Sequence, residues 1–167
     1  LQMISHGLMT ALFFALIGMI YGRTHTRNIN EMGGLMKVIP FLSVVYVIAG
    51  LASLGLPGLS GFVAEMTVFV GAFQHPDIFH RVVTVVAASS IVITAVYILR
   101  VVGILLLGPV KNPHFEHLND AKWYEKLSMI TLVLAIAGIG IAPLWLSNTI
   151  LESLKPIVEK LAMAVTF

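Results

Sequence analysis

The chain has 167 residues, of which 58% are hydrophobic and 11% are charged, against about 25% charged residues in an average soluble domain. Its formal charge of +2 comes without a patch of basic residues interleaved with aromatics, which excludes a nucleic-acid-binding role. The sequence has no cysteine, so it contains no disulfide, no cysteine-ligated iron–sulfur cluster and no thiolate zinc site. So large an apolar surface predicts a chain that is embedded in lipid.

The first apolar segment covers residues 1–21 and is long enough for one membrane helix at about 1.5 Å per residue. No positively charged stretch precedes this segment, and no small-residue cleavage pattern follows it. We therefore interpret it as a membrane span and not as a signal peptide, and we expect Leu1 to lie inside a longer parent protein.

Polar residues follow one face of this first segment. Gln2, His6 and Thr10 are spaced by four residues, so they share a helical face. Histidine titrates near neutral pH and has two ring nitrogens, which makes His6 a candidate for passing a proton along a water chain. The alternative is a structural histidine that is hydrogen-bonded to a carbonyl group.

The second apolar segment, residues 38–73, is too long for one ordinary span. Its centre carries Pro57, Gly58 and Gly61, which should interrupt a helix near 55–61. One interpretation is a single discontinuous span made of two half-helices. The other is a pair of spans joined by a tight hairpin, but the second half is short for a full crossing, which favours the discontinuous span.

One acidic residue, Glu65, lies directly after this predicted interruption and is surrounded by apolar residues. An ionised and unpaired carboxylate in lipid costs several kcal/mol, so such residues usually face water or a polar interior and mark ion or proton paths. Backbone groups freed by the interruption could bind water or a partner beside it. The alternative is a glutamate held in a structural ion pair.

The third apolar segment, residues 82–108, carries a row of polar side chains at helical spacing. Ser90, Thr94 and Tyr97 share a face, and Arg100 follows three residues later. We interpret the small polar residues mainly as interhelical hydrogen-bonding groups. Arg100 could reach toward a charged linker or pair with an acid.

The chain ends in a fourth apolar segment, residues 127–146, and a tail, residues 147–167. Apolar residues of the tail recur at helical spacing and charged residues occupy the other side, which predicts an amphipathic interfacial or docking helix. The expected domain organisation is therefore a membrane domain over 1–146 followed by this tail.

Together these segments predict an all-α, polytopic transmembrane helix bundle of about four spans, the second of them discontinuous. The linkers 22–37 and 109–126 would lie on one side with six basic residues against three on the other, and the positive-inside rule makes the first side cytoplasmic. His114 and His117 are only weak evidence for a metal site. We expect no metal or cofactor site in this chain.

Several motifs resemble one known family. The opening Leu-Gln-Met-Ile-Ser-His-Gly-Leu, the linker Arg-Thr-His-Thr-Arg and the stretch Leu-Ala-Ser-Leu-Gly-Leu-Pro-Gly-Leu-Ser-Gly-Phe-Val-Ala-Glu at 51–65 are similar to the antiporter-like subunits of complex I. The similarity is strongest over 1–73, loosens through 97–109 and ends near Pro143. It favours subunit M, the counterpart of mitochondrial subunit 4, because that subunit carries glutamate where its relatives carry lysine.

The resemblance implies a parent chain built from inverted helix repeats, with this sequence as its last helices. Pro57 would lie in the discontinuous helix of the second repeat. Glu65 and His6 would fall on the family's charged site and on its central hydrophilic axis, and both would move protons in the half-channel toward the outer face. The chain would work in a cell (inner) membrane beside other antiporter-like subunits, in a complex that uses NADH and quinone and carries FMN and iron–sulfur clusters on other chains.

Three function classes follow. The first is a proton-translocating subunit of a respiratory NADH:quinone oxidoreductase, with no redox catalysis in this chain itself. The second is a subunit of a multi-subunit sodium/proton antiporter or of a membrane-bound hydrogenase, which would share the same helices. The third is a helical anchor without an ion path, against which an acid beside an interrupted helix argues.

Overall fold

The computed structural model describes residues 1–165, and these residues form helices and connecting segments without a strand. The predicted all-α class is therefore confirmed. The α-helices are α1 (Gln2–Thr24), α2 (Leu35–Val38), α3 (Pro40–Ser53), α4 (Ser60–Phe73), α5 (Ile78–Leu106), α6 (Trp123–Ile141) and α7 (Leu144–Val165). A short 3₁₀ turn, η1 (Pro113–Phe115), lies between α5 and α6.

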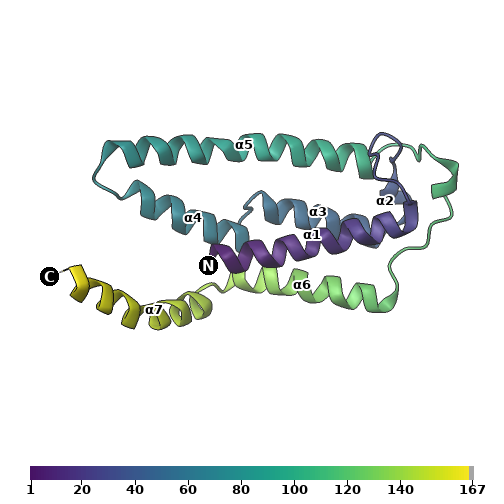
Figure 1. Cartoon of the computed structure of the whole chain (residues 1–167). Coiled ribbons are helices and arrows are strands. Elements are labelled where there is room, and N and C mark those ends of the chain that lie inside the picture. Colours follow the sequence, from purple (N-terminus) through teal and green to yellow (C-terminus); the bar gives the residue numbers. More distant parts are fainter. Residues whose placement is uncertain (166–167) are drawn as a thin grey trace.

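The long helices lie side by side as a bundle (Figure 1). α3 and α4 contact α5 on one side and α1 and α6 on the other, and α1 and α6 also contact each other. By length and apolarity, α1, α5 and α6 are each able to cross a membrane. The polytopic bundle that the sequence predicts is thus the observed architecture, and the chain is a multi-pass membrane protein.

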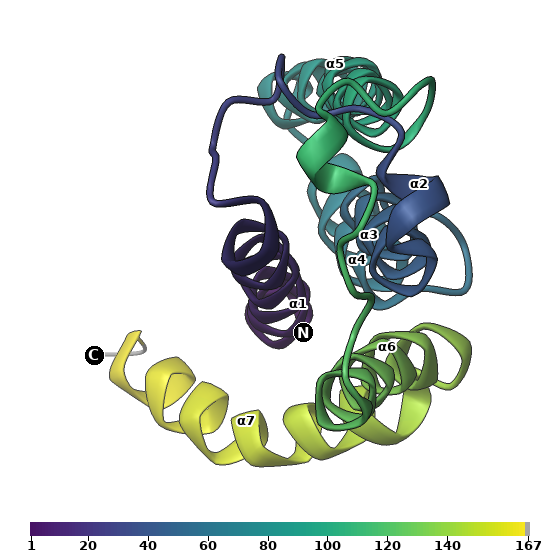
Figure 2. The same ribbon diagram turned by 90° about the vertical axis from the view of Figure 1, so that its right-hand side faces the viewer.

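The second span is discontinuous. α3 and α4 have 14 residues each, or about 21 Å, which is too short to cross a hydrocarbon core of about 30 Å alone. They follow one another along the bundle beside α5 in Figure 1 and overlap in the end-on view of Figure 2. The single span of two half-helices is therefore the correct interpretation, and the hairpin is wrong.

The interruption follows from local backbone chemistry. Pro57 and Gly58 lie between the two half-helices, whereas Gly61 already belongs to the first turn of α4. Gly55 has φ +65° and Gly58 has φ +93°, a region that residues with a Cβ rarely adopt. In addition, Gly140 of α6 packs so closely on the Gly58 carbonyl that a Cβ at position 140 would overlap it.

The buried core lies between α1, α3, α6 and the last turns of α5. The packing joins all spans except most of α5. The large side chains that are fully buried come from five helices and one loop position, and they are Leu12, Leu16, Leu35, Ile39, Leu42, Leu106, Met129 and Ile136. Most of α5 instead exposes valine, isoleucine and leucine. Exposed apolar side chains of this kind suit lipid or other membrane helices.

Polar contacts hold together one end of the bundle. We call it the loop end, and it consists of the 25–34 and 107–122 connections and the helix termini beside them. Arg23 donates to the carbonyls of Asn119 (2.8 Å) and Met19 (2.9 Å) and pairs with Glu125 (2.5 Å). The Asp120 carboxylate accepts from the Phe41 N–H at 2.7 Å and so caps α3. The connection before α6 is thereby fixed to the end of α1 and to the start of α3.

Helix ends differ from the predicted segments by a few residues. α5 begins at Ile78 and not at 82, because the Asp77 side chain accepts from the Phe79 N–H (3.2 Å) and caps it. α6 begins at Trp123 and ends at Ile141, earlier than the predicted 127–146. α7 begins at Leu144, contains Pro156 and projects away from the bundle (Figure 1). The last two residues of the predicted tail, 166–167, lie outside the described residues.

Candidate functional site

Glu65 lies one and a half turns into α4 and is partly buried. Its carboxylate turns back toward the interruption, because a Cβ built on Gly55 would stand only 2.6 Å from Glu65 Oε2. The absence of a side chain at position 55 therefore makes room for the carboxylate. The carbonyls of residues 50–52 at the end of α3 accept hydrogen bonds from the N–H groups of residues 54–56, whereas the first N–H groups of α4 have no partner within their own helix.

Among the residues that the structure describes, Glu65 has no ion pair and no side-chain hydrogen bond. The structural ion pair that the sequence left open is thus not formed with any of them. Glu125, in the first turn of α6, instead has Arg23 at 2.5 Å.

A cavity of about 280 Å³ opens beside the Glu65 carboxylate. Its polar lining comes from four helices: Gln2 of α1, Ser53 of α3, Glu65 of α4, and Ser90 and Thr94 of α5. A cavity needs only about 10–15 Å³ and a few polar partners for each water. The volume and the lining therefore suit a short chain of water molecules that reaches the carboxylate.

Ser53 also lines a second cavity, of about 210 Å³, together with Tyr46 and Tyr97. Tyr46 in turn lines a third cavity, of about 550 Å³, which extends to Thr26 and Arg27 at the loop end. Sequence reasoning missed Ser53 and Tyr46. Their seven-residue spacing on one helical face was a usable signal, but neither carries a charge that would single it out.

His6 occupies a different place from Glu65. Its neighbour Ser5 is buried and its hydroxyl shares a 2.8 Å hydrogen bond with Ser60, at the start of α4. His6 itself is exposed and does not line the Glu65 cavity, and its ring has no hydrogen bond or ion pair within residues 1–165. Of the predicted polar face, Gln2 reaches the cavity, whereas His6 and Thr10 do not.

The predicted polar row on α5 divides in the same way. Ser90 and Thr94 line the Glu65 cavity, Tyr97 lines the adjacent one, and Arg100 is exposed without an ion pair in the described chain. The expected interhelical hydrogen bonds of Ser90 and Thr94 are not formed within residues 1–165. Ser90 donates to the Ala87 carbonyl (2.6 Å) and Thr94 to the Ser90 carbonyl (3.3 Å), so both hydroxyls bond within their own helix.

The two linker histidines considered for metal binding do not converge on further ligands. His114 and His117 are exposed in the 107–122 connection and belong to no group of three potential ligands within residues 1–165.

Comparison with known proteins identifies the relatives of this chain. Residues 1–94 match the family described as NADH:quinone oxidoreductase/Mrp antiporter, transmembrane. A NAD(P)H-quinone oxidoreductase chain 4 from Synechococcus sp. (strain JA-3-3Ab) is 41% identical over 150 residues, covering 86% of this chain and 28% of that protein. A NADH-quinone oxidoreductase subunit M from Rickettsia felis is 33% identical over 159 residues, covering 95% of this chain and 31% of that protein. The chain thus spans less than a third of the length of these relatives.

Proposed function

Because the chain belongs to the NADH:quinone oxidoreductase/Mrp antiporter transmembrane family, we propose that it is part of a proton-translocating subunit of a respiratory NADH:quinone oxidoreductase. The names of its relatives, subunit M and chain 4 of such oxidoreductases, support this assignment. The chain would do no redox chemistry itself. Electron transfer from NADH to quinone, through FMN and iron–sulfur clusters, would occur on partner subunits.

Within this function, Glu65 is the proposed proton-transfer group. The observation that carries the proposal is its carboxylate beside an interrupted helix, next to a polar-lined cavity and without an ion pair among the described residues. A carboxylate without a fixed partner can gain and lose a proton as its surroundings change. Water in the cavity would carry that proton between Glu65 and the side chains of Gln2, Ser53, Ser90 and Thr94.

The bundle also suggests the direction of the path. Both connections that carry the larger number of basic residues lie at the loop end, which the positive-inside rule assigns to the inner side of the membrane. Glu65 lies on the other side of the interruption, on the half-helix that leads to the opposite end (Figure 1). Glu65 would therefore exchange protons with the outer half of the membrane.

His6 is the second proposed proton-transfer residue. Its exposed ring on α1 is accessible to further membrane helices, and the matched relatives are more than three times as long as this chain. In the whole protein His6 would face such helices and pass protons between their polar groups and the Glu65 cavity. Gln2, one turn away and already in the cavity, would link the two positions.

The test is Glu65→Gln in the intact complex. The change removes the titrating oxygen and keeps size and polarity, so the complex should assemble and still reduce quinone. The number of protons moved per electron in inverted membrane vesicles should fall, because the path through this chain is closed. Glu116→Gln, at an exposed loop glutamate, is the matched control and should leave the ratio unchanged. A normal ratio in the Glu65 variant would refute the assignment.

A second candidate is a subunit of a multi-subunit sodium/proton antiporter, because the matched family includes the Mrp antiporter. A membrane-bound hydrogenase could use the same helices. The subunits that co-purify with the chain distinguish the three. Flavin and iron–sulfur subunits with quinone reductase activity support the oxidoreductase, a nickel–iron subunit supports the hydrogenase, and sodium-dependent proton exchange without a redox partner supports the antiporter.

A further inference from the structure

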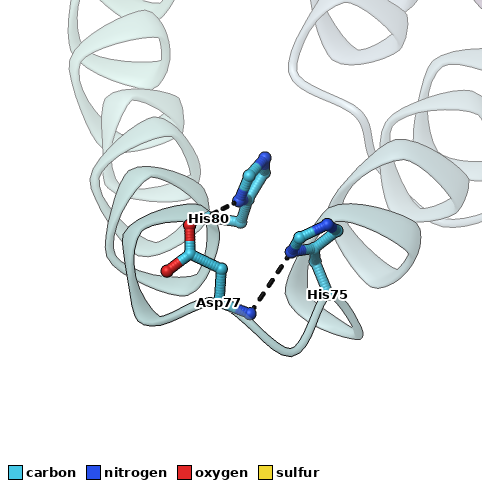
Figure 3. Close-up of side chains that lie close together, drawn as sticks. All are labelled: His75, Asp77 and His80. Atoms are coloured by element: carbon cyan, nitrogen blue, oxygen red, sulfur yellow. Dashed lines mark hydrogen bonds and ion pairs between the residues drawn. The ribbon is translucent and has the colours of Figure 1, made fainter.

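A group of metal-ligating side chains lies in the turn that joins α4 to α5, away from the loop end. His75, Asp77 and His80 are all exposed, and each offers a ligand atom within 4.8 Å of those of the other two (Figure 3). The Glu65 site uses none of these three residues.

Hydrogen bonds already hold the three side chains near one another. Asp77 Oδ2 lies 3.2 Å from His80 Nδ1, and His75 Nδ1 accepts from the Asp77 N–H at 3.3 Å (Figure 3). The two imidazole rings lie 3.9 Å apart between centroids and are tilted by 31°. Both rings therefore present nitrogens to the same small volume beside the Asp77 carboxylate.

The backbone around the cluster is fixed as well. Asp77 caps α5 through Oδ1, which accepts from the Phe79 N–H and leaves Oδ2 directed at His80. His80 lies in the first turn of α5, three residues after Asp77, so the two share one helical face. Arg81 donates to the His75 carbonyl (3.3 Å) and joins the end of α4 to the start of α5.

We infer that His75, Asp77 and His80 bind a divalent transition-metal ion of the Zn²⁺ class. Two imidazole nitrogens and one carboxylate oxygen, with water as a fourth ligand, suit tetrahedral zinc, whereas Mg²⁺ and Ca²⁺ prefer sets made of oxygen atoms. Zinc–nitrogen bonds of about 2.0–2.1 Å place ligand atoms roughly 3.3 Å apart. The three side chains are exposed, so small rotations can bring their ligand atoms from within 4.8 Å to this spacing.

The cluster lies at one end of a groove that runs toward the Glu65 cavity. A groove between α4 and α5 is lined by Phe73, Gln74 and Thr84, next to the cluster, and by Phe69, which also lines the Glu65 cavity. His75 follows Glu65 by ten residues, or about 15 Å along a helix. A bound ion would cross-link α4 to α5 at the end of the groove that runs along them. Binding itself does not depend on the proposed function.

The experiment measures zinc binding by the purified intact complex, stripped of metal with a chelator, in competition with a chromophoric zinc indicator. Asp77→Asn keeps the cap on α5, since asparagine caps helices as well as aspartate, but removes the charged ligand. His80→Gln removes an imidazole. Each variant should weaken one binding event per copy of this chain by about tenfold or more, the scale on which even outer-shell partners of a metal act.

His114→Gln and His117→Gln are the controls, because they remove exposed histidines at the opposite end of the bundle. They should leave this binding event unchanged. Equal zinc binding by the wild type and by both cluster variants would overturn the inference, and so would an equal loss in the control variants, since it would mean that the ion binds surface histidines at random.

Discussion

The loop end and the interruption of the second span differ in whether their charged side chains have hydrogen-bond and ion-pair partners. At the loop end, Arg23 has a carboxylate and several carbonyl partners, and the Asp120 carboxylate has backbone N–H partners. At the interruption, Glu65 has no such partner among the described residues, although an acid in a membrane helix costs about 2.5–3.5 kcal/mol near the helix centre. The charges with partners at the loop end fix helix positions, whereas Glu65, which has no such partner, is the residue that we propose exchanges a proton.

Substitution of Arg23 should have the largest effect on the loop end. Arg23→Met removes the partner of Glu125, and both side chains are only about one-seventh exposed (14% and 16%). We expect a loss of stability of roughly 3 kcal/mol, the scale for leaving a buried charge and its hydrogen bonds without a partner. The measurement is the midpoint of thermal inactivation of the purified complex. Arg27→Met is the control, because among the described residues Arg27 has a contact with the Tyr21 ring but no ion pair, and an equal shift would contradict the structural role of Arg23.

Two glycine substitutions test how the backbone at the interruption positions Glu65. Gly55→Ala and Gly58→Ala both force alanine into positive φ, which costs about 1–2 kcal/mol. A Cβ at 55 would also strike the Glu65 carboxylate, whereas a Cβ at 58 meets nothing within 4 Å. Both variants should lose similar stability, but only Gly55→Ala should also lower the number of protons moved per electron. The same ratio in both would show that the position of the carboxylate against Gly55 is irrelevant.

Asp120 tests whether the loop end is held by capping. Asp120→Ala leaves the first N–H groups of α3 without their acceptor and should cost about 1 kcal/mol, whereas Asp120→Asn can still accept and should cost less. The midpoint of thermal inactivation again gives the answer. If alanine and asparagine are equally harmful, the charge of Asp120 matters and its hydrogen bonds to α3 do not.

The smallest expected effect concerns the hydrogen bond that joins α1 to α4 beside the interruption. Ser5→Ala and Ser60→Ala each remove one partner of the buried 2.8 Å pair. A double-mutant cycle should give a coupling of about 0.6 kcal/mol, the average for interhelical hydrogen bonds in membranes. Additive effects of the two substitutions would mean that the pair contributes nothing as a pair.

Much of this molecule could be predicted from the sequence, since the spans and the interruption depend on local composition. The length of the apolar runs predicts the membrane helices, and Pro57 with its neighbouring glycines predicts the break in the second span. The location of Glu65 after the break follows from the same stretch. Whether Glu65 and His6 move protons stays a prediction.

The missed features depend on contacts between distant residues. Asp120 caps a helix that begins 80 positions earlier in the chain, at Pro40, and no local sequence pattern predicts such a cap. The spacing of His114 and His117 was weak evidence for a metal site, and His75, Asp77 and His80 were not considered as one group from the sequence. The cluster of His75, Asp77 and His80 forms because the turn between α4 and α5 folds two histidines onto one carboxylate.

The close packing of Gly140 on the Gly58 carbonyl has a mechanical consequence. Gly140 lies three residues before Pro143, at which α6 gives way to α7. A protein docked on α7 that pulls or turns α6 would therefore press backbone against backbone at the unwound centre of the second span. Because position 140 has no side chain, a movement of α6 would be passed directly from the backbone at Gly140 to the backbone at Gly58, in the interruption that precedes Glu65.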